Sequence, residues 1–168
     1  MRNIYLVGFM GTGKTTVGVI LAKRLKLEFI EMDSLIEQRQ GKSICQIFAD
    51  LGEEAFRQME NQLLNEISKK SNLVVSCGGG LICDPANSRI LKGSGVTFCL
   101  KASASLIYQR TKNQTQRPLL KVDNPMKKIE ELLAERKPFY ESADFIIDTD
   151  TMLPEQVAEK IIHILESN

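Results

Sequence analysis

Short apolar runs alternate with segments of helical spacing along the whole chain. The strand candidates lie at residues 4–7, 28–31, 73–76, 96–100 and 145–148. Helical patterns fill the intervals between them, which is typical of βαβ units with parallel strands. We therefore predict an α/β fold, a three-layer α/β/α sandwich around a five-stranded parallel sheet.

Apolar residues three and four positions apart indicate the helices. One is expected at residues 16–25, soon after the first strand. In the long interval between the second and third strands, Ser43 and Gln46 have the spacing of a capping box that opens a helix. Gly52 ends that helix, and another begins near Glu53. Further helices are expected at residues 86–91, 104–110, 125–141 and 154–165.

The segment after the first strand has the sequence GFMGTGKT and fits the pattern G-x-x-x-x-G-K-[S/T]. A glycine-rich turn lets successive N–H groups point at phosphate oxygens, because no Cβ atoms stand in the way. Lys14 can then reach the outer phosphates, and Thr15 can offer its hydroxyl to Mg²⁺. The following helix presents its N-terminus to the anion. We predict nucleoside triphosphate binding by Gly11, Thr12, Gly13, Lys14, Thr15 and Thr16.

Composition narrows the function classes. At 168 residues, the chain is expected to form one domain over residues 1–168. Its net charge of +1 gives no general attraction to nucleic acid or membrane. No apolar stretch has the roughly 18 residues of a membrane span, so we expect a soluble, cytoplasmic protein, and a monomer. With His163 as the only histidine and no C-x-x-C pair, zinc clusters and histidine-dependent hydrolases are disfavoured.

A second site should lie where the strands end, because ligands of open parallel sheets bind outside their carboxyl ends. The second strand ends in Glu31 and Asp33, which share a face if the strand continues through them. One could serve Mg²⁺ and the other a hydroxyl; the alternative is a solvated strand end. The third strand ends in Gly78, Gly79 and Gly80, which suits close approach of a ligand or only a tight turn.

These segments resemble the shikimate kinases, which phosphorylate the 3-hydroxyl of shikimate with ATP and Mg²⁺ on the route to chorismate and the aromatic amino acids. The likeness spans nearly the whole chain. Besides the phosphate loop and the acidic pair, it includes Phe56-Arg57-x-x-Glu60, Ser76-x-Gly78-Gly79-Gly80, Arg117-Pro118-Leu119-Leu120 and Glu135-Arg136-x-x-x-Tyr140.

The resemblance implies a P-loop kinase in which a helical insertion at about residues 33–67 binds shikimate. Asp33 would orient the acceptor hydroxyl and take its proton. The other residues implied to hold shikimate are Arg57, Arg136 and the turn of Gly78, Gly79 and Gly80, with Phe48 and Phe56 lining the pocket.

For the nucleotide, the resemblance implies a mobile lid at about residues 111–124 that carries Arg117 over the phosphates. A polar, aperiodic loop of that length is usually functional in a compact domain. Lys14 and Arg117 would act in catalysis, Arg110 would stack on adenine, and Thr15 and Glu31 would serve the metal.

Elementary chemistry supports these roles. Shikimate carries one carboxylate and three hydroxyls, which suit planar arginine forks and a carboxylate acceptor, respectively. The residues alone leave alternatives open. Arg57 and Glu60 could be a surface ion pair, and Arg136 could lie on a solvated helix face. Arg117 could be an ordinary loop cation.

Two residues depart from the family pattern. Glu31 stands where the family usually has Asp, which adds a methylene to the reach toward the metal. Cys77 precedes the glycine turn where a non-thiol residue is common; it could react if exposed, but we expect a buried thiol. The competing functions are a related small-molecule kinase, such as one for gluconate, and a nucleotide-dependent switch. The sequence contains no N-K-x-D motif that would favour the switch.

Overall fold

A parallel sheet forms the centre of the molecule. The computed structural model describes residues 2–114 and 117–167, which contain a sheet with the strand order β2-β3-β1-β4-β5. Every neighbouring pair of strands is parallel, as predicted. The strands are β1 (Asn3–Val7), β2 (Glu28–Glu31), β3 (Leu73–Ser76), β4 (Gly95–Lys101) and β5 (Phe145–Asp148). The predicted bounds of β2, β3 and β5 are confirmed, whereas β1 and β4 extend slightly beyond theirs.

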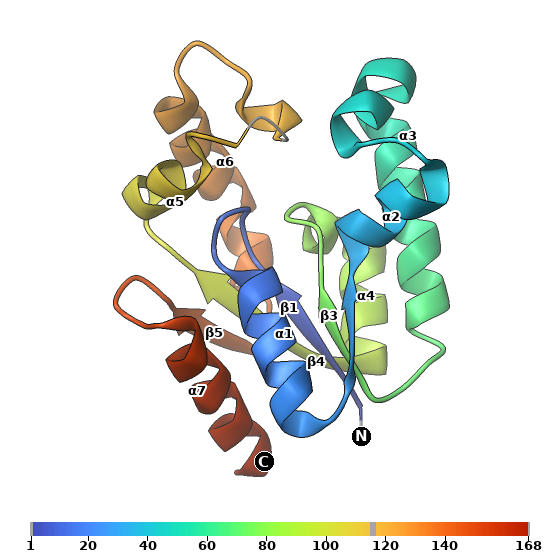
Figure 1. Ribbon diagram of the computed structural model, residues 1–168, viewed down its shortest axis with the longest axis vertical. Coiled ribbons are helices and arrows are strands. Elements are labelled where there is room, and N and C mark those ends of the chain that lie inside the picture. Colours follow the sequence, from blue (N-terminus) through green and yellow to red (C-terminus); the bar gives the residue numbers. More distant parts are fainter. Residues whose placement is uncertain (1, 115–116, 168) are drawn as a thin grey trace.

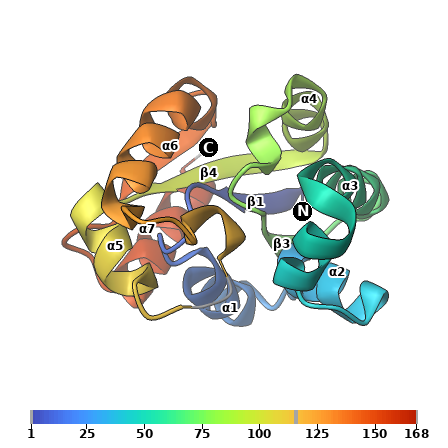
Figure 2. The same cartoon turned by 90° about the horizontal axis from the view of Figure 1, so that it is seen from above.

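Helices cover both faces of the sheet, so the central strand β1 is buried throughout (Figure 1). Its side chains alternate: Ile4 and Leu6 belong to one apolar cluster, and Tyr5 and Val7 to the other. Helices α1 (Lys14–Leu25) and α7 (Pro154–Glu166) pack on the first face. Figure 2 shows α3, α4 and α6 on the opposite face, which confirms the predicted three-layer α/β/α architecture.

The remaining helices lie close to their predicted positions. They are α4 (Pro85–Ser94), α5 (Ala104–Thr111) and α6 (Pro125–Tyr140), with short 3₁₀ turns at Leu81–Cys83 and Pro118–Leu120. Helix α3 (Ile44–Ile67) opens with the predicted capping box of Ser43 and Gln46. Gly52 interrupts it with φ of 83°, so the two predicted helices are joined at a kink.

Helix α2 (Met32–Gln40) was not predicted, and it corrects the position of Asp33. The strand ends at Glu31, whose side chain accepts the N–H of Ser34 and caps the new helix. Asp33 therefore lies in the first turn of α2, and the argument that it shares a strand face with Glu31 is wrong. Met32 and Ile36, one turn apart, are the buried residues of this helix.

Two further expectations concern the thiol of Cys77 and membrane-spanning helices. Cys77 is 2% exposed, which confirms the buried thiol, and burial raises its pKa well above the ordinary range. Within residues 2–114 and 117–167, no helix is both long enough and apolar enough to span a membrane.

Two glycine substitutions should have opposite effects on stability. A Cβ on Gly18 of α1 would lie 2.4 Å from the Phe29 ring, so Gly18→Ala should lower the free energy of unfolding by about 1–3 kcal/mol. A Cβ on Gly93 of α4 would meet no atom within 4 Å, so Gly93→Ala should raise it by about 0.5–1 kcal/mol. Urea unfolding measures both. A Gly18 variant as stable as the wild type would contradict the packing of α1 against β2.

Candidate active site

Two cavities lie side by side at the carboxyl edge of the sheet. The first, of about 500 Å³, covers the loop after β1, and we name it the phosphate-loop cavity. The second, of about 550 Å³, lies between α2, α3, the turn after β3 and α6; we name it the arginine cavity. Seven residues line both: Met10, Thr15, Glu31, Asp33, Gly79, Gln114 and Arg117. The two cavities therefore form one continuous site.

The phosphate-loop cavity brings together every residue that the sequence predicts for nucleotide binding: Gly11, Thr12, Gly13, Lys14, Thr15, Thr16, Arg110 and Arg117. Arg110 extends from α5 and donates a hydrogen bond to the carbonyl of Gly11 at 3.0 Å. Thr149, Met152 and Pro154, at the start of α7 and just before it, line the same cavity.

Lys14 lies across its own loop. Its Nζ donates hydrogen bonds to the carbonyls of Gly8 at 2.8 Å and Phe9 at 2.9 Å. Burial lowers the pKa of Lys14 to about 8, because the ammonium group is removed from water, although the nearby Asp33 opposes this shift. An anion in the cavity would favour the charged ammonium form, so this lysine suits a phosphate ligand.

The arginine cavity contains all six residues predicted for the acceptor: Asp33, Arg57, Gly78, Gly79, Gly80 and Arg136. Arg57 comes from α3 and Arg136 from α6. The glycine turn lies close to both, since a Cβ on Gly80 would be 2.9 Å from the Arg57 guanidinium and one on Gly79 would be 3.7 Å from Arg136 Nη1. Two guanidinium groups beside a bare backbone can bind a carboxylate.

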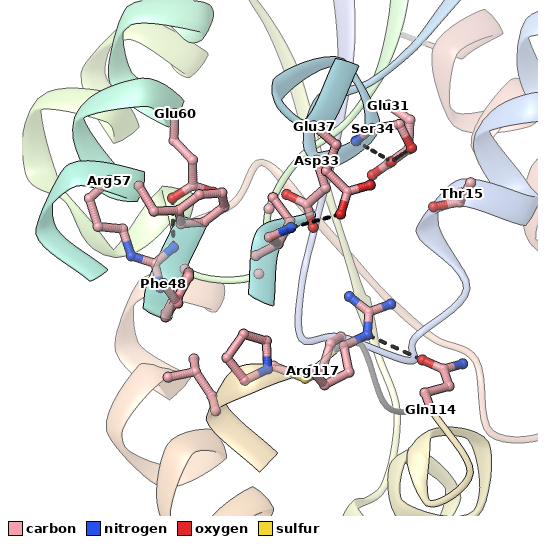
Figure 3. Close-up of a pocket in the computed structure, with 18 of the residues that line it drawn as sticks. Thr15, Glu31, Asp33, Ser34, Glu37, Phe48, Arg57, Glu60, Gln114 and Arg117 are labelled. Carbon is pink, nitrogen blue, oxygen red and sulfur yellow. Dashed lines mark hydrogen bonds and ion pairs between the residues drawn. The ribbon is translucent and has the colours of Figure 1, made fainter. Parts of the chain in front are cut away.

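In the Arg57–Glu60 pair Glu60 is buried and Arg57 is partly buried, so the pair is not the exposed surface ion pair of the alternative. Arg57 Nη1 donates to Glu60 Oε2 at 2.6 Å, and the Glu60 side chain is only 1% exposed (Figure 3). Burial raises the pKa of Glu60 to about 7, and the charge of Arg57 opposes the shift. Arg136 is only 7% exposed, so it does not lie on a solvated face.

Two carboxylate oxygens beside this cavity are buried without a hydrogen-bond partner, Asp33 Oδ1 and Glu60 Oε1. A Cβ on Gly78 would be 2.0 Å from the Glu60 oxygen and 3.3 Å from the Asp33 oxygen, so the two oxygens are at most 5.3 Å apart. Burial raises the pKa of Asp33, and Glu31 adds to the rise. Both oxygens are shielded from solvent, so they lie behind the wall of the cavity and do not face its open space.

The boundary between the cavities offers oxygen ligands. Thr15 Oγ1 lies 3.5 Å from Ser76 Oγ, and Glu31 lines both cavities. Glu31 Oε2 accepts the Ser34 N–H at 2.8 Å, so Glu31, at the end of β2, caps helix α2. Within the described residues, no three His, Cys, Asp or Glu side chains form a metal cluster. A hydroxyl and a carboxylate, completed by water and phosphate oxygens, fit the preferences of Mg²⁺.

Arg117 reaches into the boundary from the predicted lid (Figure 3). Its Nε donates to Gln114 Oε1 at 3.2 Å. Residues 115 and 116 of the predicted lid lie outside the described residues.

Sequence reasoning missed several lining residues. Glu37 lies four residues after Asp33 on α2, and its Oε1 accepts the N–H of Ile44 at 2.8 Å, which joins α2 to the start of α3. Recognition of α2 would have placed Glu37 and Asp33 on one face. Gln114 lines both cavities, and nothing in the sequence distinguishes it.

Comparison with known proteins identifies the family. A family model described as shikimate kinase matches residues 10–166. The chain belongs to the shikimate kinase family.

Individual members of the shikimate kinase family align over almost their full length. A shikimate kinase of Thermodesulfovibrio yellowstonii is 49% identical over 96% of this chain and 94% of that protein. One from Pelotomaculum thermopropionicum is 46% identical over 100% of this chain and 98% of its own. Among solved structures, the shikimate kinase of Acinetobacter baumannii in complex with shikimate has a TM-score of 0.97 and 42% identity, covering 100% of this chain and 94% of that one.

Glu60→Gln should change how stability depends on pH. The pKa of Glu60 is about 7 in the folded protein, against about 4.3 in an unfolded chain. Between these values the folded state keeps a proton that the unfolded chain loses, so wild-type stability falls as pH rises, by up to about 1.4 kcal/mol per unit from this group. Glutamine does not titrate. Urea unfolding at about pH 5 and pH 8 should therefore show that the free energy of unfolding falls more between these pH values for the wild type than for Glu60→Gln.

The matched control is Glu53→Gln, since Glu53 pairs with the same Arg57 guanidinium but its side chain is 50% exposed. Its stability profile should parallel that of the wild type. If the Glu60 and Glu53 variants gave the same profile, burial of Glu60 would not control the pH dependence.

Proposed function

We propose that the protein transfers the γ-phosphoryl group of ATP to the 3-hydroxyl of shikimate, which gives shikimate 3-phosphate and ADP for chorismate and aromatic amino acid biosynthesis. The observation that carries this proposal is the meeting of the two cavities at Asp33 and Arg117. A phosphate loop opens on one side of this boundary, and a pair of arginines faces the other.

The arginine cavity matches the chemistry of shikimate. Its carboxylate would bind between the guanidinium groups of Arg57 and Arg136, which can each offer two parallel N–H donors. The backbone of Gly79 and Gly80 would add donors to the same carboxylate. Asp33, which lines both cavities, would accept a hydrogen bond from the hydroxyl that reacts.

Transfer would be direct and in line. Burial raises the pKa of Asp33, which makes it a better proton acceptor for the shikimate 3-hydroxyl. Lys14 and Arg117 would stabilise the charge that spreads over the phosphoryl oxygens. Thr15 and Glu31 would hold Mg²⁺, which when bound neutralises charge on the outer phosphates. One oxygen of Glu31 already accepts the Ser34 N–H, so Glu31 would hold the ion through the remaining lone pairs of its carboxylate.

The remaining organisation is proposed with the function. Residues 1–168 would form one kinase domain in which the insertion at about 33–67 binds the acceptor and the segment at about 111–124 closes as a lid. With a net charge of +1, the protein has no general attraction to nucleic acid or membrane surfaces, and we propose a cytoplasmic monomer.

A coupled assay of ADP release tests the function against its two competitors. Shikimate should stimulate release strongly with Mg²⁺ and ATP present, gluconate should not, and release without an acceptor should be slow. Lys14→Ala should nearly abolish turnover because it removes charge beside the phosphates. Stimulation by gluconate would favour the related sugar-acid kinase, and equal slow release in all three mixtures would favour a nucleotide-dependent switch.

Arg136→Lys should raise the KM for shikimate by at least about tenfold and leave the KM for ATP nearly unchanged. A lysine keeps the charge but cannot form two parallel hydrogen bonds with a carboxylate, and such charged bonds contribute about 1.5–3 kcal/mol. Arg57→Lys should act in the same direction. Steady-state kinetics with each substrate varied in turn measures the effect.

The matched control for these variants is Arg110→Lys. Arg110 lines the phosphate-loop cavity and not the arginine cavity, so its substitution should raise the KM for ATP and spare that for shikimate. Equal changes in both KM values for Arg136→Lys would contradict the separation of the two subsites.

A further inference from the structure

Tyr140 is a buried tyrosine whose hydroxyl reaches the glycine turn of the arginine cavity. It is the last residue of α6 and is 8% exposed. Its Oη donates a hydrogen bond to the carbonyl of Gly79 at 2.7 Å. The side chain does not line either cavity of the active site. Tyr140 therefore contacts the backbone of the turn from behind and not the ligand space.

This hydrogen bond also fixes the orientation of the Gly80 N–H. The carbonyl of Gly79 and the N–H of Gly80 belong to one planar trans peptide, so they point in opposite directions. When Tyr140 holds the carbonyl, the Gly80 N–H is directed away from the tyrosine. Gly80 borders the arginine cavity and lies against the Arg57 guanidinium. Within the described residues, no protein acceptor is found for the Gly80 N–H.

We propose that Tyr140 is a positioning residue that orients the Gly79–Gly80 peptide, so that the Gly80 N–H donates to the carboxylate of the acceptor. This inference rests on the proposed function. A peptide between two glycines rotates with little steric resistance, so an external hydrogen bond is needed to hold one orientation. Tyr140 supplies that bond.

The same helix positions the cavity's second arginine. Arg136 and Tyr140 are four residues apart on α6, so they lie on one face of that helix. The packing of α6 thus sets both the guanidinium and the Gly80 N–H at once. Burial raises the pKa of Tyr140 above its ordinary value, although the charge of Arg136 opposes the shift, so the phenol remains a donor at neutral pH.

Tyr140→Phe tests the proposal, because it removes the hydroxyl and keeps the ring. We expect the KM for shikimate to rise at least about tenfold, as for loss of one oriented hydrogen bond to a charged group. The KM for ATP and kcat should change less than twofold, since the carboxylate is remote from the transferred phosphoryl group.

The matched control is Tyr5→Phe. Tyr5 is also buried, and its hydroxyl is hydrogen-bonded to Ser94 at 2.8 Å, away from both cavities. This variant should lose stability in thermal melting and keep wild-type KM values. Circular dichroism and thermal melting of both variants establish that each is folded at the assay temperature. If Tyr5→Phe raised the KM for shikimate as much as Tyr140→Phe, a general loss of stability would explain the effect and the proposal would be overturned.

An acceptor analogue separates positioning from a purely structural role. In the analogue the carboxylate of shikimate is replaced by a hydroxymethyl group, which cannot accept the charged hydrogen bond. Wild type and Tyr140→Phe should then differ by less than twofold in kcat/KM for the analogue. An equal loss with both acceptors, or an unchanged KM for shikimate, would overturn the proposal while leaving the proposed function intact. Failure of the wild type to phosphorylate shikimate would instead overturn both.

Discussion

The active site depends on burying opposite charges together. Glu60 is 1% exposed, and a lone carboxylate at that depth would cost several kcal/mol. The 2.6 Å ion pair with Arg57 offsets part of this cost, since burial still raises the pKa of Glu60, and it fixes the guanidinium at the wall of the arginine cavity. A ligand carboxylate consequently meets an arginine that is already ordered, and binding need not immobilise its long side chain. Arg136, only 7% exposed, is fixed on the other side by α6 and the Phe9 ring, 5.7 Å from its Cζ atom.

The parallel sheet determines where these charges can meet. β1, β2 and β3 all end at one edge, and they lead into the phosphate loop, Glu31 and the glycine turn, respectively. Gly78 keeps space at this edge, because a Cβ there would stand 2.0 Å from a Glu60 oxygen. The absence of a side chain in the turn is therefore as necessary as the charges. It allows the carboxylates of Asp33 and Glu60 to approach each other at this edge.

Much of the fold could be predicted from local patterns. Strands buried on both faces read as continuous apolar runs, which is why β3 was predicted with its true bounds. The bounds of β2 were also predicted correctly, although only Ile30 of that strand is buried. Helix α2 was missed because most of its residues are polar and only Met32 and Ile36 are buried. The signal for its start is the side chain of Glu31, which we interpreted as a metal ligand or a solvated strand end and not as a helix cap. Asp33 reaches the site from the first helical turn and not from the strand.

The depth of the site could not be predicted without the family resemblance. Arg and Glu three residues apart occur equally on solvated helices, and only the packing of α3 decides that Glu60 is buried. The role of Tyr140 could not be predicted from the sequence either. Its place in the motif with Arg136 marks it as part of the pattern, but its contact with Gly79 joins residues 61 positions apart. A sequence motif thus identifies the members of the site, and tertiary packing decides which of them face the ligand and which hold the others in place.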